Sequence, residues 1–403
     1  GLPASQQVRG VLPAKVVRRV RRNLRVSRLR VRANERSGEV RGDSKAAARV
    51  ISQKREQAMK SLWSVLGVVV LMLAGAADAA DQVTRRSDRV VLRGELTELS
   101  TTALKMKLQN GQDAEIPVSE VLAIRFDMEP PTLVQAQSNE RSGALATALE
   151  KYKQIQGEYS GDDKRVVTEL KFLIARTQVR MAQANPADFA AAEKAIGTFR
   201  SDSRTNFRYL EATLLEAELL AGDAAKADAA KKLLEEVQQT SVKGFRLQAG
   251  VQLGLLLLAG KDTEGAQAAF EKVVQESAGD ALAAGAMFDG QLGKALCQKT
   301  AGKPDEALAT LADVFTKASE SETKTLARAW LLKGDCFREK GLPKDALMAY
   351  LHVDVLYSSE PGPHAESLYH LATLWGPAGY QNRADDARAR LTNSYPNSRW
   401  AKQ

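Results

Sequence analysis

The chain has 403 residues, of which 44% are hydrophobic and 5% aromatic, and its formal net charge is +9. This length allows two or three domains. The charge is uneven, because residues 1–58 carry +12 and residues 59–403 carry −3. The positive charge of the whole chain therefore comes from residues 1–58, and it is no evidence that the folded part binds nucleic acid.

Residues 1–58 form a basic leader with 13 arginines and 3 lysines. One interpretation is an arm for nucleic acid or an anionic membrane surface. The other is that the leader is not a natural part of the protein, because no methionine precedes Met59 and arginine greatly outnumbers lysine. Both interpretations predict a disordered segment.

Residues 59–80 have the three parts of a secretory signal peptide. Lys60 supplies the positive start, residues 62–74 are an apolar run, and Ala77 and Ala79 form a small-residue cleavage pattern. Cleavage would leave Ala80, or a residue within two of it, at the N-terminus. If the basic leader is natural, an uncleaved membrane anchor is the better interpretation, and residues 62–74 would contact the membrane.

Residues 84–130 change to the period of β-strands and predict a small all-β module. Asn110-Gly111 is a strong hairpin signal. We expect a four-strand meander that resembles a small SH3-like or Sm-like barrel, with strands at 90–96, 103–108, 114–117 and 121–126. A sheet of this size buries little surface, so we expect it to lean on the helical part or on a second copy.

Residues 131–403 repeat one spacing, in which a small residue is followed after 12 positions by an alanine. A bulky residue comes four positions later and a branched one three beyond it. Offsets of four and seven share one helix face, so each set predicts an apolar stripe on a second helix, with its alanine facing the small residue on the first. The sets are Gly254, Ala266, Phe270 and Val273; Ala295, Ala307, Leu311 and Val314; Gly334, Ala346, Tyr350 and Val353; and Ala372, Ala384 and Leu391.

Three looser stripes begin at Ala148, Ala192 and Ala230, which brings the prediction to seven helix pairs. In two of them Arg180 and Glu218 occupy the position of the small residue, so the register is less well defined there. Steps of roughly 36 to 44 residues between helix pairs are typical of a solenoid.

The set that contains Trp330, Gly334, Ala346 and Tyr350 resembles the tetratricopeptide repeat, a helix–turn–helix unit. The resemblance implies a mainly α fold: a right-handed α-solenoid that follows the signal-peptide helix and the β-module. The end of the chain, Tyr395 to Ala401 in the last repeat, resembles the repeat endings of periplasmic tetratricopeptide-repeat proteins of bacteria. Such arrays present a concave groove, built from first helices, to a protein partner.

We predict the lining of this groove from positions three before, one after and four after each small residue. These positions share a face of the first helix. The predicted groove residues are Val251, Leu255, Leu258, Leu292, Leu296, Lys299, Leu331, Asp335, Arg338 and Tyr369. Packing between neighbouring helix pairs is the alternative role for the apolar members.

The sequence contains none of the common catalytic or nucleotide-binding motifs. Its three histidines do not share a helix face, so we expect no metal and no cofactor. Cys297 and Cys336 occupy equivalent places in neighbouring units, too far apart for a disulfide, and we expect two buried free thiols.

These observations predict an exported scaffold of the cell envelope, rather than an enzyme, that binds another protein or a peptide segment. No nucleic acid is expected to bind the folded part. The alternative is a membrane-anchored or nucleic-acid-associated protein that uses the basic leader.

Overall fold

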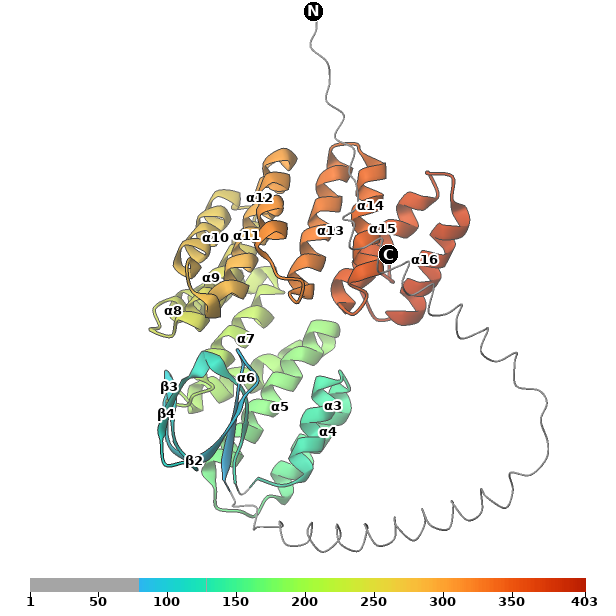
Figure 1. The fold of residues 1–403 in the computed structure, drawn as a ribbon. Coiled ribbons are helices and arrows are strands. Elements are labelled where there is room, and N and C mark those ends of the chain that lie inside the picture. The colour runs from blue at the N-terminus through green and yellow to red at the C-terminus, as the bar shows by residue number, and fades with distance from the viewer. Residues whose placement is uncertain (1–79, 128) are drawn as a thin grey trace, which may run out of the picture. The chain divides into compact units, whose positions relative to one another are not determined.

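A computed structural model describes residues 80–127 and 129–403 (Figure 1). The basic leader, the predicted signal peptide and its cleavage pattern lie outside these residues. The described part begins with a five-stranded antiparallel sheet and continues as pairs of helices, which confirms the predicted mainly α fold with a small β-module.

The sheet has one strand more than the sequence predicts. Its strands are β1 (Asp81–Arg85), β2 (Val91–Leu99), β3 (Ala103–Leu108), β4 (Asp113–Pro117) and β5 (Val121–Arg125), in the order β4-β3-β2-β1-β5. The expected meander therefore stops at β4, because β5 pairs with β1. The prediction missed β1 because its five residues include a single large hydrophobic one, Val83, which is fully buried.

Asp81 connects the start of the sheet to the helical part. Its buried carboxylate accepts hydrogen bonds from the amides of Leu96 and Asp127, at 3.0 Å each, and from Arg165 Nη1 at 2.9 Å. The apolar residues of the sheet belong to the same core cluster as those of the helices that follow. The sheet therefore packs against the helical part, which is one of the two partners expected for it.

Seven pairs of helices follow in the described part of the chain. Three-residue 3₁₀ turns precede α6, α8 and α11. The helices are α3 (Thr132–Arg141), α4 (Leu145–Glu158), α5 (Lys164–Ala184), α6 (Phe189–Asp202), α7 (Tyr209–Ala221), α8 (Ala227–Gln238), α9 (Lys243–Ala259), α10 (Thr263–Ser277), α11 (Ala284–Thr300), α12 (Pro304–Lys317), α13 (Thr323–Glu339), α14 (Pro343–Leu356), α15 (Pro361–Trp375) and α16 (Gln381–Ser394).

The predicted stripes lie on the even-numbered helices from α4 to α16, and they are buried. All seven stripe alanines are at most 1% exposed. The exception within a stripe is Arg388, which is exposed at the bulky position of α16, where Ala387 is buried instead.

The register shifts by one residue in the two pairs where Arg180 and Glu218 replace the small residue. There, Val179 and Ala217 are fully buried, each 13 residues before the stripe alanine. The shift has a local cause, because the 3₁₀ turns Pro186–Asp188 and Ala224–Lys226 lengthen the connection to α6 and α8.

Glycines allow aromatic side chains to fill the contacts between helices. A Cβ atom on Gly254 would lie 2.6 Å from the ring of Phe270, and one on Gly334 would lie 2.5 Å from the ring of Tyr350. Gly293 of α11 presses against the same Phe270 ring from the next pair. The atoms nearest to a Cβ on Gly334 belong to the Tyr350 ring, the bulky member of the same stripe as Ala346, which is itself fully buried.

Substitution of these glycines tests this packing. We expect Gly254→Ala and Gly334→Ala each to destabilise the fold by about 1–3 kcal/mol, because the added methyl overlaps a buried ring. Gly157→Ala in α4 is the control, since no atom lies within 4 Å of the added methyl. It should stabilise the helix by up to about 1 kcal/mol. Thermal unfolding followed by circular dichroism measures all three, and equal shifts in the melting temperature would contradict the packing.

Candidate functional site

A cavity of about 160 Å³ lies where the first helices α9, α11 and α13 meet, and α15 contributes to its lining. We call it the first-helix cavity. Six of the ten predicted groove residues line it, namely Val251, Leu255, Leu292, Leu296, Leu331 and Asp335. The structure therefore brings together residues that are up to 84 positions apart in the chain.

The apolar side of the first-helix cavity presents Leu255 to solvent. This side chain is 42% exposed. Val251 and Leu296 beside it are half-buried, whereas Leu292 and Leu331 are buried and pack within the core. The burial of Leu292 and Leu331 agrees better with packing between neighbouring helix pairs than with a place in an open groove.

Asp335 organises the polar side of the cavity. Its carboxylate accepts a hydrogen bond of 2.7 Å from the hydroxyl of Tyr350. It lies 3.7 Å from Arg338, 4.0 Å from Lys299 and 3.8 Å from His370. Arg338 and Lys299, both predicted for the groove, thus reach the rim of the cavity through Asp335.

Two further side chains near Asp335 have shifted pKa values. Burial, together with repulsion by Asp335, raises the pKa of Glu366 to about 6, and burial lowers the pKa of His370 to about 4. At neutral pH Glu366 is therefore mostly ionised and His370 is neutral. The His370 ring stacks on Tyr350, with the ring centres 4.6 Å apart.

Two predicted groove residues lie elsewhere. Leu258 packs against the cluster of Ala266, Phe270 and Cys297. The ring of Tyr369 lies against Trp400, with 5.1 Å between the ring centres. Tyr369 is half-buried by this contact with the end of the chain, which the spacing rule did not take into account.

Sequence reasoning missed three charged residues of the first-helix cavity, Asp289, Arg328 and Glu366. Each lies six positions before a small residue, at Ala295, Gly334 and Ala372 respectively. This offset is one helical turn before the row that the prediction used, and it belongs to the same helix face. Extending the row by one turn would have found all three. Asp289 and Arg328 form an ion pair with each other.

The first helices before α9 differ, because buried ion pairs connect them. Glu140 of α3 is 2% exposed and accepts hydrogen bonds from Arg176 at 2.7 and 2.8 Å and from Arg180 at 3.1 Å. Arg208 is 4% exposed and donates to Glu169 at 2.7 and 3.1 Å. These charges are satisfied within the protein, so they do not form an open binding surface.

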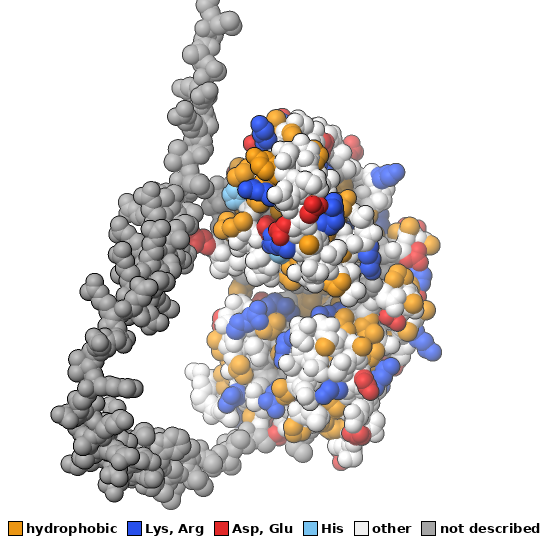
Figure 2. Space-filling view, turned by 90° about the vertical axis from the view of Figure 1, so that its right-hand side faces the viewer, with side chains coloured by type: hydrophobic (Ala, Val, Ile, Leu, Met, Phe, Trp, Pro, Cys, Tyr) orange, Lys and Arg blue, Asp and Glu red, His pale blue; other side chains and the backbone are white. Residues whose placement is uncertain are grey.

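Charges of both signs are mixed on the face shown in Figure 2, where Lys and Arg side chains are scattered among acidic and hydrophobic ones. This distribution agrees with the net charge of −3 for residues 59–403. Within residues 80–127 and 129–403, no helix is long and apolar enough to cross a membrane.

Cys297 and Cys336 are free and buried, as predicted. Burial raises the pKa of each thiol to about 11, so neither is a reactive thiolate at neutral pH. In the described residues, no group of three or more His, Cys, Asp or Glu side chains is placed to hold a metal ion.

Seven stacked helix pairs with an open row of first-helix side chains define an α-helical repeat protein. Residues 248–278, which cover most of α9 and all of α10, match the family model of the tetratricopeptide repeat. This match confirms the resemblance to the tetratricopeptide repeat that was inferred from the sequence, over this one unit of the array. The match falls on an earlier unit than the copy around Trp330.

Several solved structures are similar in helical architecture. A tetratricopeptide repeat protein from Parabacteroides merdae is 15% identical, with 67% of this chain and 96% of that chain covered and a TM-score of 0.46. PilW, a type IV pilus biogenesis factor, is 16% identical, with 59% and 97% covered and a TM-score of 0.41. A Rap protein complexed with competence and sporulation factor is 12% identical, with 67% and 76% covered and a TM-score of 0.46. No curated protein matches the chain.

Proposed function

We propose that this protein is an interaction scaffold that holds a segment of another protein against the first-helix cavity. The observation that carries the proposal is the solvent-exposed Leu255 at the apolar side of a cavity whose rim is charged. An apolar anchor on the partner would cover Leu255 and Leu296. Polar groups beside the anchor would meet Asp335, Arg338 and Glu366. A dry centre with a polar rim is the usual anatomy of a protein interface.

We further propose that the protein acts in the cell envelope after export. The support is the order of Lys60, the apolar run 62–74 and the Ala77–Ala79 pattern. Strand β1 begins at Asp81, so cleavage before Ala80 would leave the whole sheet in the mature protein. The alternative, a membrane-anchored or nucleic-acid-associated protein that uses the basic leader, predicts that these residues are retained.

Export is tested by the N-terminus of protein that is produced from Met59. We expect N-terminal sequencing of the mature product to begin at Ala80 or within two residues of it, because a signal peptidase cuts after the second small residue. Ala79→Arg is the control, and it should block cleavage at this position. A parent protein that keeps residues 62–74 and stays in the membrane would contradict cleavage and favour an anchor.

Binding at the first-helix cavity is tested with a partner captured from cell extract by the purified protein. We expect Leu255→Glu to weaken binding by about tenfold or more, because loss of a central contact costs about 1–2 kcal/mol or more. Arg338→Glu should weaken binding by a smaller factor, because Arg338 lies at the rim. Val355→Glu on α14 is the matched control, since Val355 is 70% exposed and lines none of the cavities described here.

Titration calorimetry measures the affinities, and circular dichroism confirms that each variant is folded. If folded Leu255→Glu and Arg338→Glu bind as tightly as the parent does, the functional surface lies elsewhere on the protein.

A further inference from the structure

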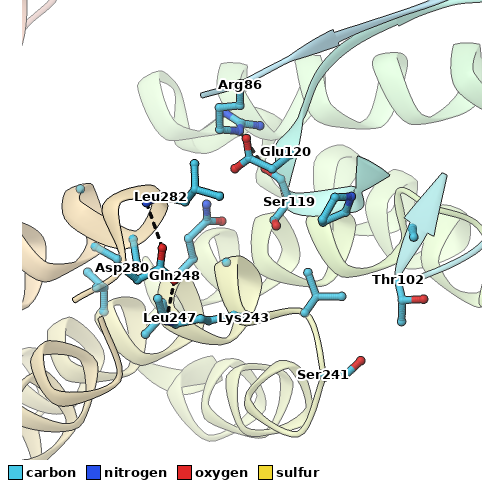
Figure 3. Close-up of a pocket in the computed structure, with 18 of the residues that line it drawn as sticks. Arg86, Thr102, Ser119, Glu120, Ser241, Lys243, Leu247, Gln248, Asp280 and Leu282 are labelled. Atoms are coloured by element: carbon cyan, nitrogen blue, oxygen red, sulfur yellow. Dashed lines mark hydrogen bonds and ion pairs between the residues drawn. The ribbon is translucent and has the colours of Figure 1, made fainter. Parts of the chain in front are cut away.

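A second, larger cleft lies between the sheet and the helical array. Its volume is about 830 Å³, which is within the range of sites that hold small ligands or several residues of a peptide. Figure 3 shows Arg86, Ser119 and Glu120 of the sheet region across the cleft from Gln248 and Leu282 of the helical region. We call it the sheet–helix cleft.

Gly244 holds the two walls of this cleft close together. It lies in the first turn of α9, and a Cβ atom on it would be 2.6 Å from Cβ of Ser119. The 3₁₀ turn Val118–Glu120 therefore rests directly on the start of α9. This close contact between the two walls requires a glycine, because a Cβ atom would overlap Ser119.

Residues of both strands of the β3–β4 hairpin line one wall of the cleft, and β4 has a free edge there because it pairs only with β3. At one end of the β3–β4 pairing, Val118 N donates a hydrogen bond to Thr102 O. At the other end, Leu108 N donates to Gln112 O. In an antiparallel pair hydrogen-bonded and non-hydrogen-bonded residues alternate. The N–H and C=O groups of Glu115, and the C=O of Pro117, consequently point away from β3. Glu115 and Pro117 are also the two β4 residues that line the cleft.

The opposite wall offers contacts for side chains. Leu282 is 69% exposed at the cleft, and Leu247 and Val251 of α9 lie along it. The side-chain oxygen Oε1 of Gln252, which also lines the cleft, has no hydrogen-bond partner. An extended chain that lies between the walls would find main-chain partners on one side and apolar contacts on the other.

The sheet–helix cleft adjoins the first-helix cavity, because Val251 and Asp289 line both. Its ionisable lining is mainly acidic, with Glu115, Glu120, Asp280 and Asp289 against Arg86 and Lys243. Lys243 is already paired with Asp280 at 2.6 Å. Asp289 is likewise paired with Arg328. Glu115 and Glu120 against Arg86 therefore leave one negative charge, which favours a basic occupant.

We infer that the cleft and the first-helix cavity form one channel for an extended, basic segment of a partner protein, whose main chain pairs with the free edge of β4. Addition of a strand to an exposed edge is a recurrent mode of peptide binding, in which the main chain supplies affinity and side-chain contacts supply specificity. The inference rests on the proposed function and adds the β-module to the binding surface. Binding would also cover the unpaired N–H and C=O groups at the edge of β4.

The test uses a dodecapeptide selected from a random phage-displayed library on the full, purified protein. Fluorescence anisotropy then measures its affinity for the parent and for variants. We expect Lys or Arg to be enriched in the selected peptides. Glu115→Lys, which reverses a charge at the cleft, and Glu115→Pro, which removes an outward N–H, should each weaken binding by about fivefold to tenfold. Glu95→Lys on β2 is the matched control, since Glu95 is exposed and does not line the cleft.

Hydrogen exchange provides a readout that docking on helices alone would not change. The amides of Asp113 and Glu115, which face away from β3, should exchange rapidly in the free protein and become protected when the peptide binds. If Glu115→Lys binds as the parent does and these amides gain no protection, the inference is overturned.

The variant Leu255→Glu separates the two proposals. If it weakens peptide binding while the Glu115 variants do not, the first-helix cavity is the binding site and the role of β4 is wrong. If neither position affects binding, or if no peptide is selected, both proposals fail. Should Glu115→Pro fail to fold, Glu115→Lys and the exchange measurement decide the matter.

Discussion

The packing of one aromatic ring between two glycines is the constraint on which the helix array depends. Phe270 of α10 is fully buried, and it contacts Gly254 in its own pair and Gly293 in the next. Because neither glycine has a Cβ atom, both first helices approach the same ring closely. Tyr350 fills the equivalent place, with Gly334 on one side and the stacked ring of His370 on the other. In α10 and α14 the second helix thus sets the spacing of the first helices that flank it, and a solenoid is built from such contacts between neighbours.

This spacing decides what the first helices offer to a partner. In α3, α5 and α7 the available positions are taken by charges that neutralise one another, such as Glu140 with Arg176, and the sheet packs nearby. From α9 onward the first helices leave Leu255 exposed and place charged groups around Asp335. The sheet–helix cleft and the first-helix cavity adjoin at α9, because Val251 of this helix lines both.

The stripes could be predicted from the sequence because an alanine followed by larger residues at offsets of four and seven has one physical solution, a buried helix face. Strand β1 could not, since a five-residue strand with one large hydrophobic residue carries almost no periodic signal. The Arg180 position misled the register because a 3₁₀ turn, invisible to a spacing rule, adds a residue before α6. Half of the cavity lining followed from the helix face, whereas Asp289, Arg328 and Glu366 needed one more turn of the same row. The sheet–helix cleft depends on contacts between distant segments, such as Gly244 with Ser119, which no local pattern encodes.

A double-mutant cycle between Gly254 and Phe270 tests this account most directly. The free energy of unfolding would be measured in urea for Gly254→Ala in the parent and in a Phe270→Leu background. If the ring is what the glycine accommodates, the smaller leucine leaves room for the added methyl, and most of the cost of Gly254→Ala disappears in that background. The same cost in both backgrounds would show that the glycine is needed for another reason, and would contradict the ring-and-glycine packing as the basis of the array.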